Sequence, residues 1–148
     1  MAFTGKAASN IGGTTIHSAL HLPTNQSLSN HGKLSSEKLT KLNEQYEQLK
    51  FIVIDEISLV GARMLDAVDQ RLRSIKHVQN KFFGGLDVIV TGDFYQAPPV
   101  RDRWIFQKLN LGLNAIAPNF WHEYIKCYEL NIVMRQNDVM FINILNRF

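Results

Sequence analysis

Two short apolar runs that end abruptly in polar residues constrain the fold more than any other feature. Residues 51–54 read Phe-Ile-Val-Ile and lead into Asp55 and Glu56, and a second run at 86–91 leads into Gly-Asp. Such runs are typical of strands buried on both faces of a parallel sheet. Strand, helix, strand in this order predicts a right-handed crossover and an α/β fold. The helix is predicted by apolar residues that share one face, namely Val60, Met64, Val68, Leu72 and Ile75.

The flanking segments give weaker signals. Apolar residues at three- and four-residue intervals predict an amphipathic helix over 36–49. Ser, Asn, Thr and Gly dominate 22–36, which predicts a loop or small inserted excursion. Adjacent prolines within 94–100 exclude a regular strand or helix and predict a stiff extended loop. We expect a short strand at 126–130 and a closing helix that has Asn137 or Asp138 as its cap and includes the apolar positions of 141–148.

Composition limits the class of protein. With 148 residues, 45% hydrophobic and 20% charged, the chain is expected to form one soluble intracellular domain without membrane association. The single cysteine, Cys127, excludes an internal disulfide and the usual structural zinc site. His17 and His21 have helical i, i+4 spacing, but no acidic residue completes a metalloprotease motif. A net charge of +3 is compatible with a polyanionic partner and does not establish one.

The strand ends carry the candidate chemistry, because ligands of open α/β sheets bind beyond the carboxyl ends of the strands. An acidic pair after a strand is weak evidence by itself, since strands commonly end in polar turns. A nucleotide hydrolase needs a carboxylate for Mg²⁺, a base for the attacking water and a polar group beside the terminal phosphate. Asp55, Glu56 and Gln96 supply these types. Arg135 is a candidate phosphate ligand, although a surface arginine is an equally good interpretation.

Five strings, in order and in register, resemble the PIF family of superfamily-one DNA helicases. Each string alone is weak evidence, whereas five across nearly the whole chain are not expected by chance. The string that follows the second strand is the most distinctive. The five are Thr4-Gly5-Lys6-Ala7-Ala8 with Thr15-Ile16-His17-Ser18, Ile54-Asp55-Glu56-Ile57-Ser58, Phe83-Gly84-Gly85, Gly92-Asp93-Phe94-Tyr95-Gln96-Ala97-Pro98-Pro99-Val100, and Arg135-Gln136.

The resemblance implies a RecA-like motor domain that, with a second such domain, hydrolyses ATP, moves 5′ to 3′ along single-stranded DNA and unwinds forked DNA. It implies that Asp55 binds Mg²⁺, Glu56 activates water, and Gln96 and Arg135 contact the γ-phosphate. It also implies a nuclear or mitochondrial setting in a eukaryote, with roles in DNA repair, recombination and telomere maintenance. For two aromatic residues of the DNA set, Phe94 and Tyr95, packing in the core is an equal alternative. The implied DNA contacts are Thr4, Gly5, Lys6, Thr15, His17, Ser18, Phe94, Tyr95 and Pro98.

One family motif, the phosphate loop G-x-x-x-x-G-K-[ST], occurs nowhere in the sequence. We therefore expect residues 1–148 to be a partial first motor domain that lacks this loop, the first strand and the second motor domain. The absent strand is expected beside 51–54, leaving apolar surface exposed and the isolated chain without ATPase activity. Two alternatives stay open: a non-catalytic remnant that binds single-stranded nucleic acid, and a different P-loop enzyme, which would not reproduce residues 94–100.

Overall fold

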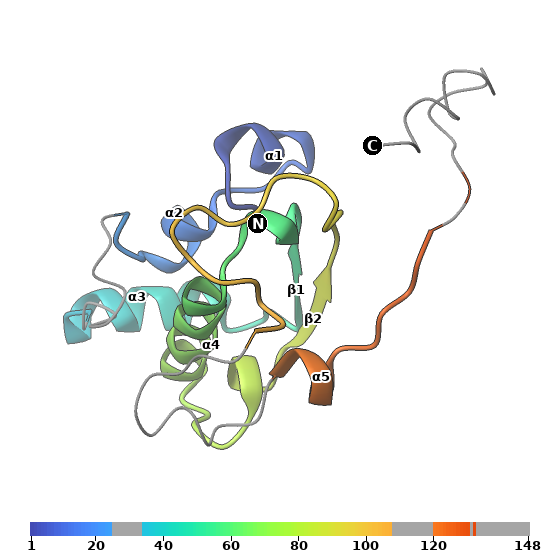
Figure 1. The fold of residues 1–148 in the computed structure, drawn as a ribbon. Helices are drawn as coiled ribbons and strands as arrows, with labels where there is room; N and C mark the ends of the chain where they lie inside the picture. Colours follow the sequence, from blue (N-terminus) through green and yellow to red (C-terminus); the bar gives the residue numbers. More distant parts are fainter. Residues whose placement is uncertain (25–33, 108–119, 131, 133–148) are drawn as a thin grey trace.

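A small parallel sheet lies at the centre of the fold, with helices packed against one of its faces (Figure 1). The computed structural model describes residues 1–24, 34–107, 120–130 and 132. The elements are α1 (Gly5–Asn10), α2 (Ile16–Leu20), α3 (Ser36–Tyr46), β1 (Phe51–Ile54), η2 (Ile57–Leu59), α4 (Ala62–Lys76), η3 (Phe82–Gly85), β2 (Asp87–Val90) and α5 (Phe120–Tyr124).

The predicted strand–helix–strand unit is confirmed. β1 and β2 pair in parallel, with Phe51 opposite Asp87 and Ile54 opposite Val90. α4 connects them and packs its apolar face into the main core, which also contains Ile52 and Ile54. α4 begins at Ala62 rather than near Val60, because the chain is still extended there and the next residue is the helix N-cap.

The N-terminal residues lie along the other side of β1. The Asp55 amide donates to the Met1 carbonyl (2.9 Å), and the Ile16 amide donates to the Ala2 carbonyl (2.9 Å). Ala2 thereby forms parallel bridges to both Asp55 and Thr15. Met1 and Ala2 therefore pair only with the carboxyl end of β1, and the absent strand expected beside residues 51–54 stays a prediction.

The open edge of the sheet, within the described part of the chain, belongs to β2. The Asp87 amide donates to the Lys50 carbonyl (3.1 Å) and the Thr91 amide to the Ile54 carbonyl (2.9 Å). Since the N–H groups of a strand alternate in direction, those of Val88 and Val90 point away from β1. Within the described ranges no strand pairs with this edge of β2.

The expectation that both strands are buried on both faces is wrong. Ile52 and Ile54 are buried against the helices, but Phe51 on the opposite face is 55% exposed and Ile89 is 52% exposed. Helices α3 and α4 lie on the same side of the sheet, as Figure 1 shows. The apolar character of the second face is therefore not explained by contacts among the described residues.

The remaining predictions have mixed outcomes. The helix predicted over 36–49 is confirmed as α3, capped by Ser35, whose hydroxyl accepts from the Lys38 amide (3.4 Å). Residues 126–130 do not form the predicted strand, because no described strand pairs with them; Leu130 is 94% exposed. Most of the predicted excursion at 22–36, and the helix at 141–148, lie outside the described residues. No described helix combines the length and apolarity needed to cross a bilayer.

Candidate nucleotide and DNA site

The polar ends of β1 and β2 lie side by side, as the sequence predicts. The Thr91 hydroxyl donates to Asp55 Oδ1 (2.6 Å), and the Ile57 amide donates to the Thr91 carbonyl (2.9 Å). These bonds fix the Asp55 carboxylate at the edge of the sheet. Thr91 was not among the predicted site residues, although it follows β2 directly and the parallel register alone would place it near Asp55.

Glu56 turns the chain sharply out of β1. Its backbone is left-handed (φ 55°, ψ 49°), a conformation that is unfavourable for residues other than glycine. The turn leads directly into η2 and lies against Gly92, where a Cβ would come within 2.8 Å of the Ile57 amide nitrogen. Glycine at 92 is therefore required for the close approach of the two strand ends.

Asp93 shapes the turn that presents Gln96. Its Oδ1 accepts from the Tyr95 amide (2.9 Å), and its carbonyl accepts from the Gln96 amide (3.1 Å). The Gln96 side chain, which is exposed, donates from Nε2 to Asp93 Oδ2 at 3.4 Å. Asp93 is thus a second residue that contributes to the site without having been predicted, and its signal is the Asp-x-x pattern of a side-chain-stabilised turn.

A pocket of about 210 Å³ brings Glu56 and Gln96 together with two predicted DNA contacts, Thr4 and Lys6. The pocket lies between the end of the sheet and α1. It is also lined by one residue that was not predicted, Ser58, whose hydroxyl is fully buried and has no hydrogen-bond partner within the described structure. The full lining is Thr4, Lys6, Ala7, Asn10, Glu56, Ser58, Leu59, Gln96 and Ala97.

The predicted hydroxyl contacts serve as helix caps. Thr4 Oγ1 accepts from the Ala7 amide (3.2 Å) and starts α1. Thr15 Oγ1 accepts from the Ser18 amide (3.2 Å) and donates to Ser18 Oγ (3.0 Å), which starts α2. The bridges of Ala2 hold these two helix starts next to each other. Beside Thr4, Gly5 and Lys6 are exposed.

A second, larger cleft of about 330 Å³ adjoins the first, since Leu59 lines both. His17 lies in it with its ring edge-on to Phe3, at 5.7 Å between ring centroids. Burial lowers the pKa of His17, so that its imidazole is neutral at pH 7. The remaining lining residues are Pro23, Thr24, Leu59, Gly61, Arg63, Met64, Pro99, Val100, Arg101 and Asp102.

The two aromatic candidates of the loop after β2 have different surroundings. Phe94 packs edge-on against Trp104, Phe106 and Trp121, with ring centroids 5.3–5.8 Å apart. Tyr95 is 100% exposed. This geometry favours core packing for Phe94 and leaves Tyr95 as the ring available for stacking. Pro98 is exposed as well, while the adjacent Pro99 is buried in the cleft wall.

The acidic residues of the site suit a metal ion that is bound jointly by the protein and a ligand better than one that is bound by protein side chains alone. In the described ranges no group of three or more His, Cys, Asp or Glu side chains converges. Mg²⁺ typically takes one or two carboxylates and completes its shell with water and substrate phosphates. Asp55, oriented by Thr91, together with the neighbouring Glu56 fits that description. Arg135, the predicted phosphate ligand, lies outside the described residues.

Comparison with known proteins decides the family. The profile of PIF1-like helicases matches residues 1–143. The chain belongs to the PIF1-like helicase family. The ATP-dependent DNA helicase PIF1 of Saccharomyces cerevisiae is 36% identical over 99% of this chain and 17% of its own length. Human PIF1 is 34% identical over 97% of this chain and 22% of its own length. The chain therefore spans about a fifth of the length of these relatives.

Solved PIF1 structures confirm the fold as a partial RecA-like α/β domain. Pif1 of Candida albicans superposes with a TM-score of 0.74 at 29% identity, over 99% of this chain and 32% of that one. Unliganded Pif1 of Bacteroides gives 0.72 at 33% identity, over 99% and 34%. Bacteroides Pif1 bound to single-stranded DNA gives 0.57 at 36% identity, over 68% and 23%.

Proposed function

We propose that this chain forms part of an ATP-dependent DNA helicase, as the portion of the first motor domain in which nucleotide-facing and DNA-facing residues meet. The 210 Å³ pocket carries this proposal, because Glu56 and Gln96 share it with Thr4 and Lys6. A pocket built from both sets offers a short route by which hydrolysis of ATP alters contacts with DNA. The relatives named above as ATP-dependent DNA helicases support the same interpretation.

On the nucleotide side each residue has one role. Asp55, held by the Thr91 hydroxyl, provides the carboxylate for Mg²⁺, and the ion supplies charge neutralisation of the phosphates when it is bound. Glu56 accepts the proton of the attacking water. Gln96, positioned by Asp93, donates a neutral amide hydrogen bond to the γ-phosphate, and Arg135 adds a cationic contact.

On the DNA side the exposed Lys6 neutralises a backbone phosphate and the fully exposed Tyr95 stacks on a base. Thr4 lines the first pocket and His17 the second cleft, and the remaining proposed DNA contacts, which lie near these residues or in the loop after β2, are Gly5, Thr15, Ser18 and Pro98. His17 is neutral at pH 7 because burial lowers its pKa, so it contributes hydrogen bonding or stacking rather than charge. The activity that we propose for the whole protein is translocation from 5′ to 3′ with unwinding of forked DNA, in the nucleus or mitochondrion of a eukaryotic cell.

ATP turnover requires parts beyond these 148 residues. The sequence contains no G-x-x-x-x-G-K-[ST] string, and the proposed ATPase needs such a phosphate-binding loop together with a second motor domain. The same observation is the basis of the alternative function, a non-catalytic module that binds single-stranded nucleic acid. The 148-residue chain alone is expected to show no ATPase activity; magnesium-dependent turnover that disappears in Glu56→Gln would overturn this expectation.

Binding of a fluorescent oligothymidylate, followed by anisotropy over a range of salt concentrations, tests the DNA side. Lys6→Ala is expected to weaken binding and to reduce the log–log salt slope by about 0.7, the contribution of one phosphate contact on a single strand. Tyr95→Ala is expected to weaken binding by 1–3 kcal/mol, roughly the value of one stacked base, with the slope unchanged. Lys38→Ala on α3 removes one exposed lysine remote from both clefts and is the matched control. Equal effects of Lys6→Ala and Lys38→Ala would contradict the proposed surface.

A further inference from the structure

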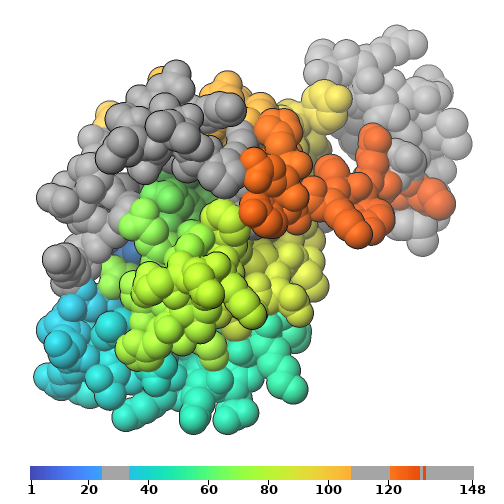
Figure 2. Space-filling model, turned by 90° about the horizontal axis from the view of Figure 1, so that it is seen from below, coloured from blue at the N-terminus to red at the C-terminus, as the bar shows by residue number. Residues whose placement is uncertain are grey.

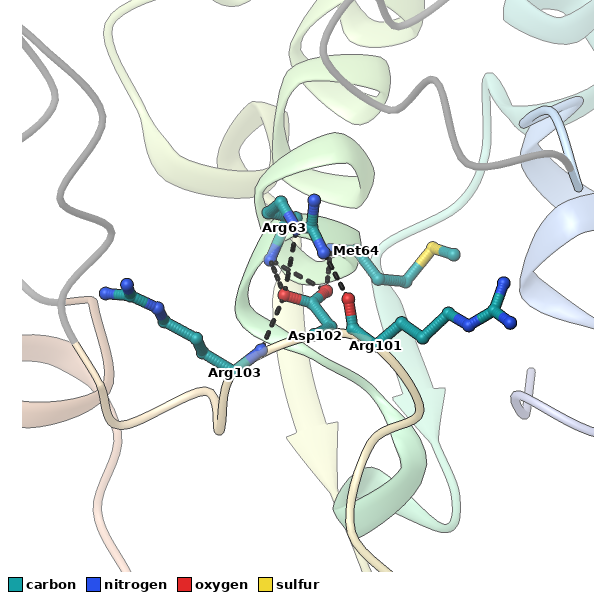
Figure 3. A network of polar contacts seen from close by, with 5 residues as sticks. All are labelled: Arg63, Met64, Arg101, Asp102 and Arg103. Carbon is teal, nitrogen blue, oxygen red and sulfur yellow. Dashed lines mark hydrogen bonds and ion pairs between the residues drawn. The ribbon is translucent and has the colours of Figure 1, made fainter.

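Helix α4 is capped by a residue from a distant loop rather than by its own N-cap residue. Gly61 occupies the N-cap position and has no side chain to accept from the first amides of the helix. The carboxylate of Asp102 takes that place, as Figure 3 shows: Oδ2 accepts from the amides of Arg63 (3.1 Å) and Met64 (3.3 Å). These are the two amides that an N-cap side chain ordinarily satisfies.

Further bonds attach the loop around Asp102 to the first turn of α4. Arg63 Nε donates to Asp102 Oδ1 (3.2 Å), and the other end of the Arg63 guanidinium donates to the Arg101 carbonyl. The Ala62 amide donates to the Arg103 carbonyl (2.8 Å). The Asp102 side chain is only 8% exposed, so this ion pair is shielded from water on the carboxylate side.

Residue 61 has to be glycine because Asp102 lies against it, and not because of its backbone conformation. Its φ of −83° and ψ of 166° are open to any residue, but a Cβ at this position would overlap the Asp102 carboxylate. A glycine at 61 and an aspartate at 102 therefore form a matched pair. Unlike an ordinary cap, which lies next to its helix in sequence, this pair joins segments about 40 residues apart, as the separation between Arg63 and Asp102 shows.

We propose that Asp102 is a positioning residue that holds Pro99, Val100 and Arg101 against α4 as one wall of the cleft for single-stranded DNA. The role rests on the function proposed above. The 330 Å³ cleft is lined by both the start of α4 and these loop residues, so the attachment through Asp102 fixes where this part of the cleft wall lies. The loop also carries Tyr95 and Gln96 at its beginning, which extends the effect toward the first pocket.

A pair of variants separates capping of the helix from attachment of the loop. Asp102→Ala removes both, whereas Gly61→Ser combined with Asp102→Ala gives α4 a cap of its own and keeps the loop displaced, because a Cβ at residue 61 would lie 2.3 Å from the Cβ of residue 102. Thermal melting is expected to fall by roughly 3–6 °C in Asp102→Ala and to recover in the double variant. Binding of oligothymidylate is expected to weaken about threefold or more in both, because the DNA contact depends on attachment of the loop.

Hydrogen exchange at single amides measures the attachment of the Asp102 loop to α4 without the use of DNA. In the double variant the Arg63 and Met64 amides should again be protected, while the Ala62 amide, which bonds to the loop, should exchange faster than in the wild type. Gly61→Ser alone should be less stable than the double variant, because its side chain overlaps Asp102.

Other results would overturn the proposal. Recovery of both melting temperature and DNA affinity in the double variant would show that Asp102 acts only through stability. Unchanged DNA affinity in Asp102→Ala would lead to the same conclusion. A wild-type chain that does not bind oligothymidylate would remove the proposed function and the positioning role with it, whereas normal protection of Ala62 in the double variant would refute the attachment alone.

Discussion

Glu56 holds a left-handed backbone conformation that costs a residue with a Cβ roughly 1–2 kcal/mol. The structure around it enforces this geometry: the Ile57 amide is bonded to the Thr91 carbonyl, and Gly92 packs against the turn. Strain at a residue whose side chain lines a pocket is consistent with selection for the position of that side chain rather than for stability. The two carboxylates are therefore held in different ways. Glu56 is positioned by its left-handed backbone, whereas Asp55 is positioned by the hydrogen bond from the Thr91 hydroxyl.

Glu56→Gly tests this strain. The substitution is expected to raise the free energy of unfolding by about 0.5–1 kcal/mol, because relief of the left-handed strain exceeds the larger chain entropy of glycine. Urea denaturation measures the change. His77→Gly is the matched control, since His77 has a similar φ of 54° at the end of α4 and lines neither cleft. A loss of stability in Glu56→Gly alongside a gain in His77→Gly would contradict the assignment of strain.

His17 makes stability depend on pH. Burial lowers its pKa below the ordinary value of 6.5, so between that value and the lowered pKa the unfolded chain binds more protons than the folded one. Stability contributed by neutral His17 is present above pH 6.5 and is lost as pH falls through that interval. His17→Gln should flatten the fall in melting temperature below pH 6.5, whereas His122→Gln, at an exposed position, should leave it unchanged. Equal slopes of melting temperature against pH in the wild type, His17→Gln and His122→Gln would refute this prediction.

At the scale of elements, the corner between α4 and η3 depends on one buried carboxylate. Asp69 Oδ1 accepts from the Phe83 amide (2.5 Å) and Oδ2 accepts from Arg73 Nε (2.8 Å). Phe83 and Gly84 both have positive φ, and a Cβ at Gly84 would meet the Leu72 carbonyl at 2.7 Å. The Phe-Gly-Gly string is therefore a structural motif that returns the chain from α4 to β2.

Asp69→Ala is expected to lower the free energy of unfolding by about 2–3 kcal/mol, since it leaves a buried amide and a partly buried guanidinium without their acceptor. Urea denaturation checks the value. Glu37→Ala removes an exposed ion pair to Lys41 and should change stability by less than about 0.5 kcal/mol. A similar small change for both variants would show that the Asp69 contacts contribute little.

The elements themselves follow closely from local patterns. β1 matches its predicted bounds, and α3 and α4 match in place and period, because apolar spacing reports the face that a helix buries. The cap of α4 could not be predicted, because Asp102 is remote in sequence and only the tertiary approach of its loop makes it an acceptor. Asp93 and Thr91 were more accessible to prediction. Asp93 precedes the predicted site residue Phe94, and the parallel register places Thr91 near Asp55.

At the scale of the whole molecule, the two clefts share Leu59 and lie along the carboxyl end of the sheet and the loop that follows it. The space-filling view from below shows the opposite end of the molecule, over α3, η3 and the starts of the strands (Figure 2). The meeting of strand-end residues at one edge follows from the parallel topology alone. The exposure of Phe51 and Ile89 does not, because it depends on which elements cover the second face of the sheet.

The central proposal is that Glu56 activates the water that hydrolyses ATP, and that this hydrolysis is coupled to DNA binding. The most direct test places residues 1–143 into Saccharomyces cerevisiae PIF1 in exchange for its matching segment and measures ATP turnover with and without single-stranded DNA. DNA-stimulated turnover is predicted, and Glu56→Gln should lower it by about 10²–10⁴-fold while DNA affinity changes less than about twofold. Turnover that is unaffected by Glu56→Gln, or a protein that binds ATP and DNA without turnover, would contradict the claim.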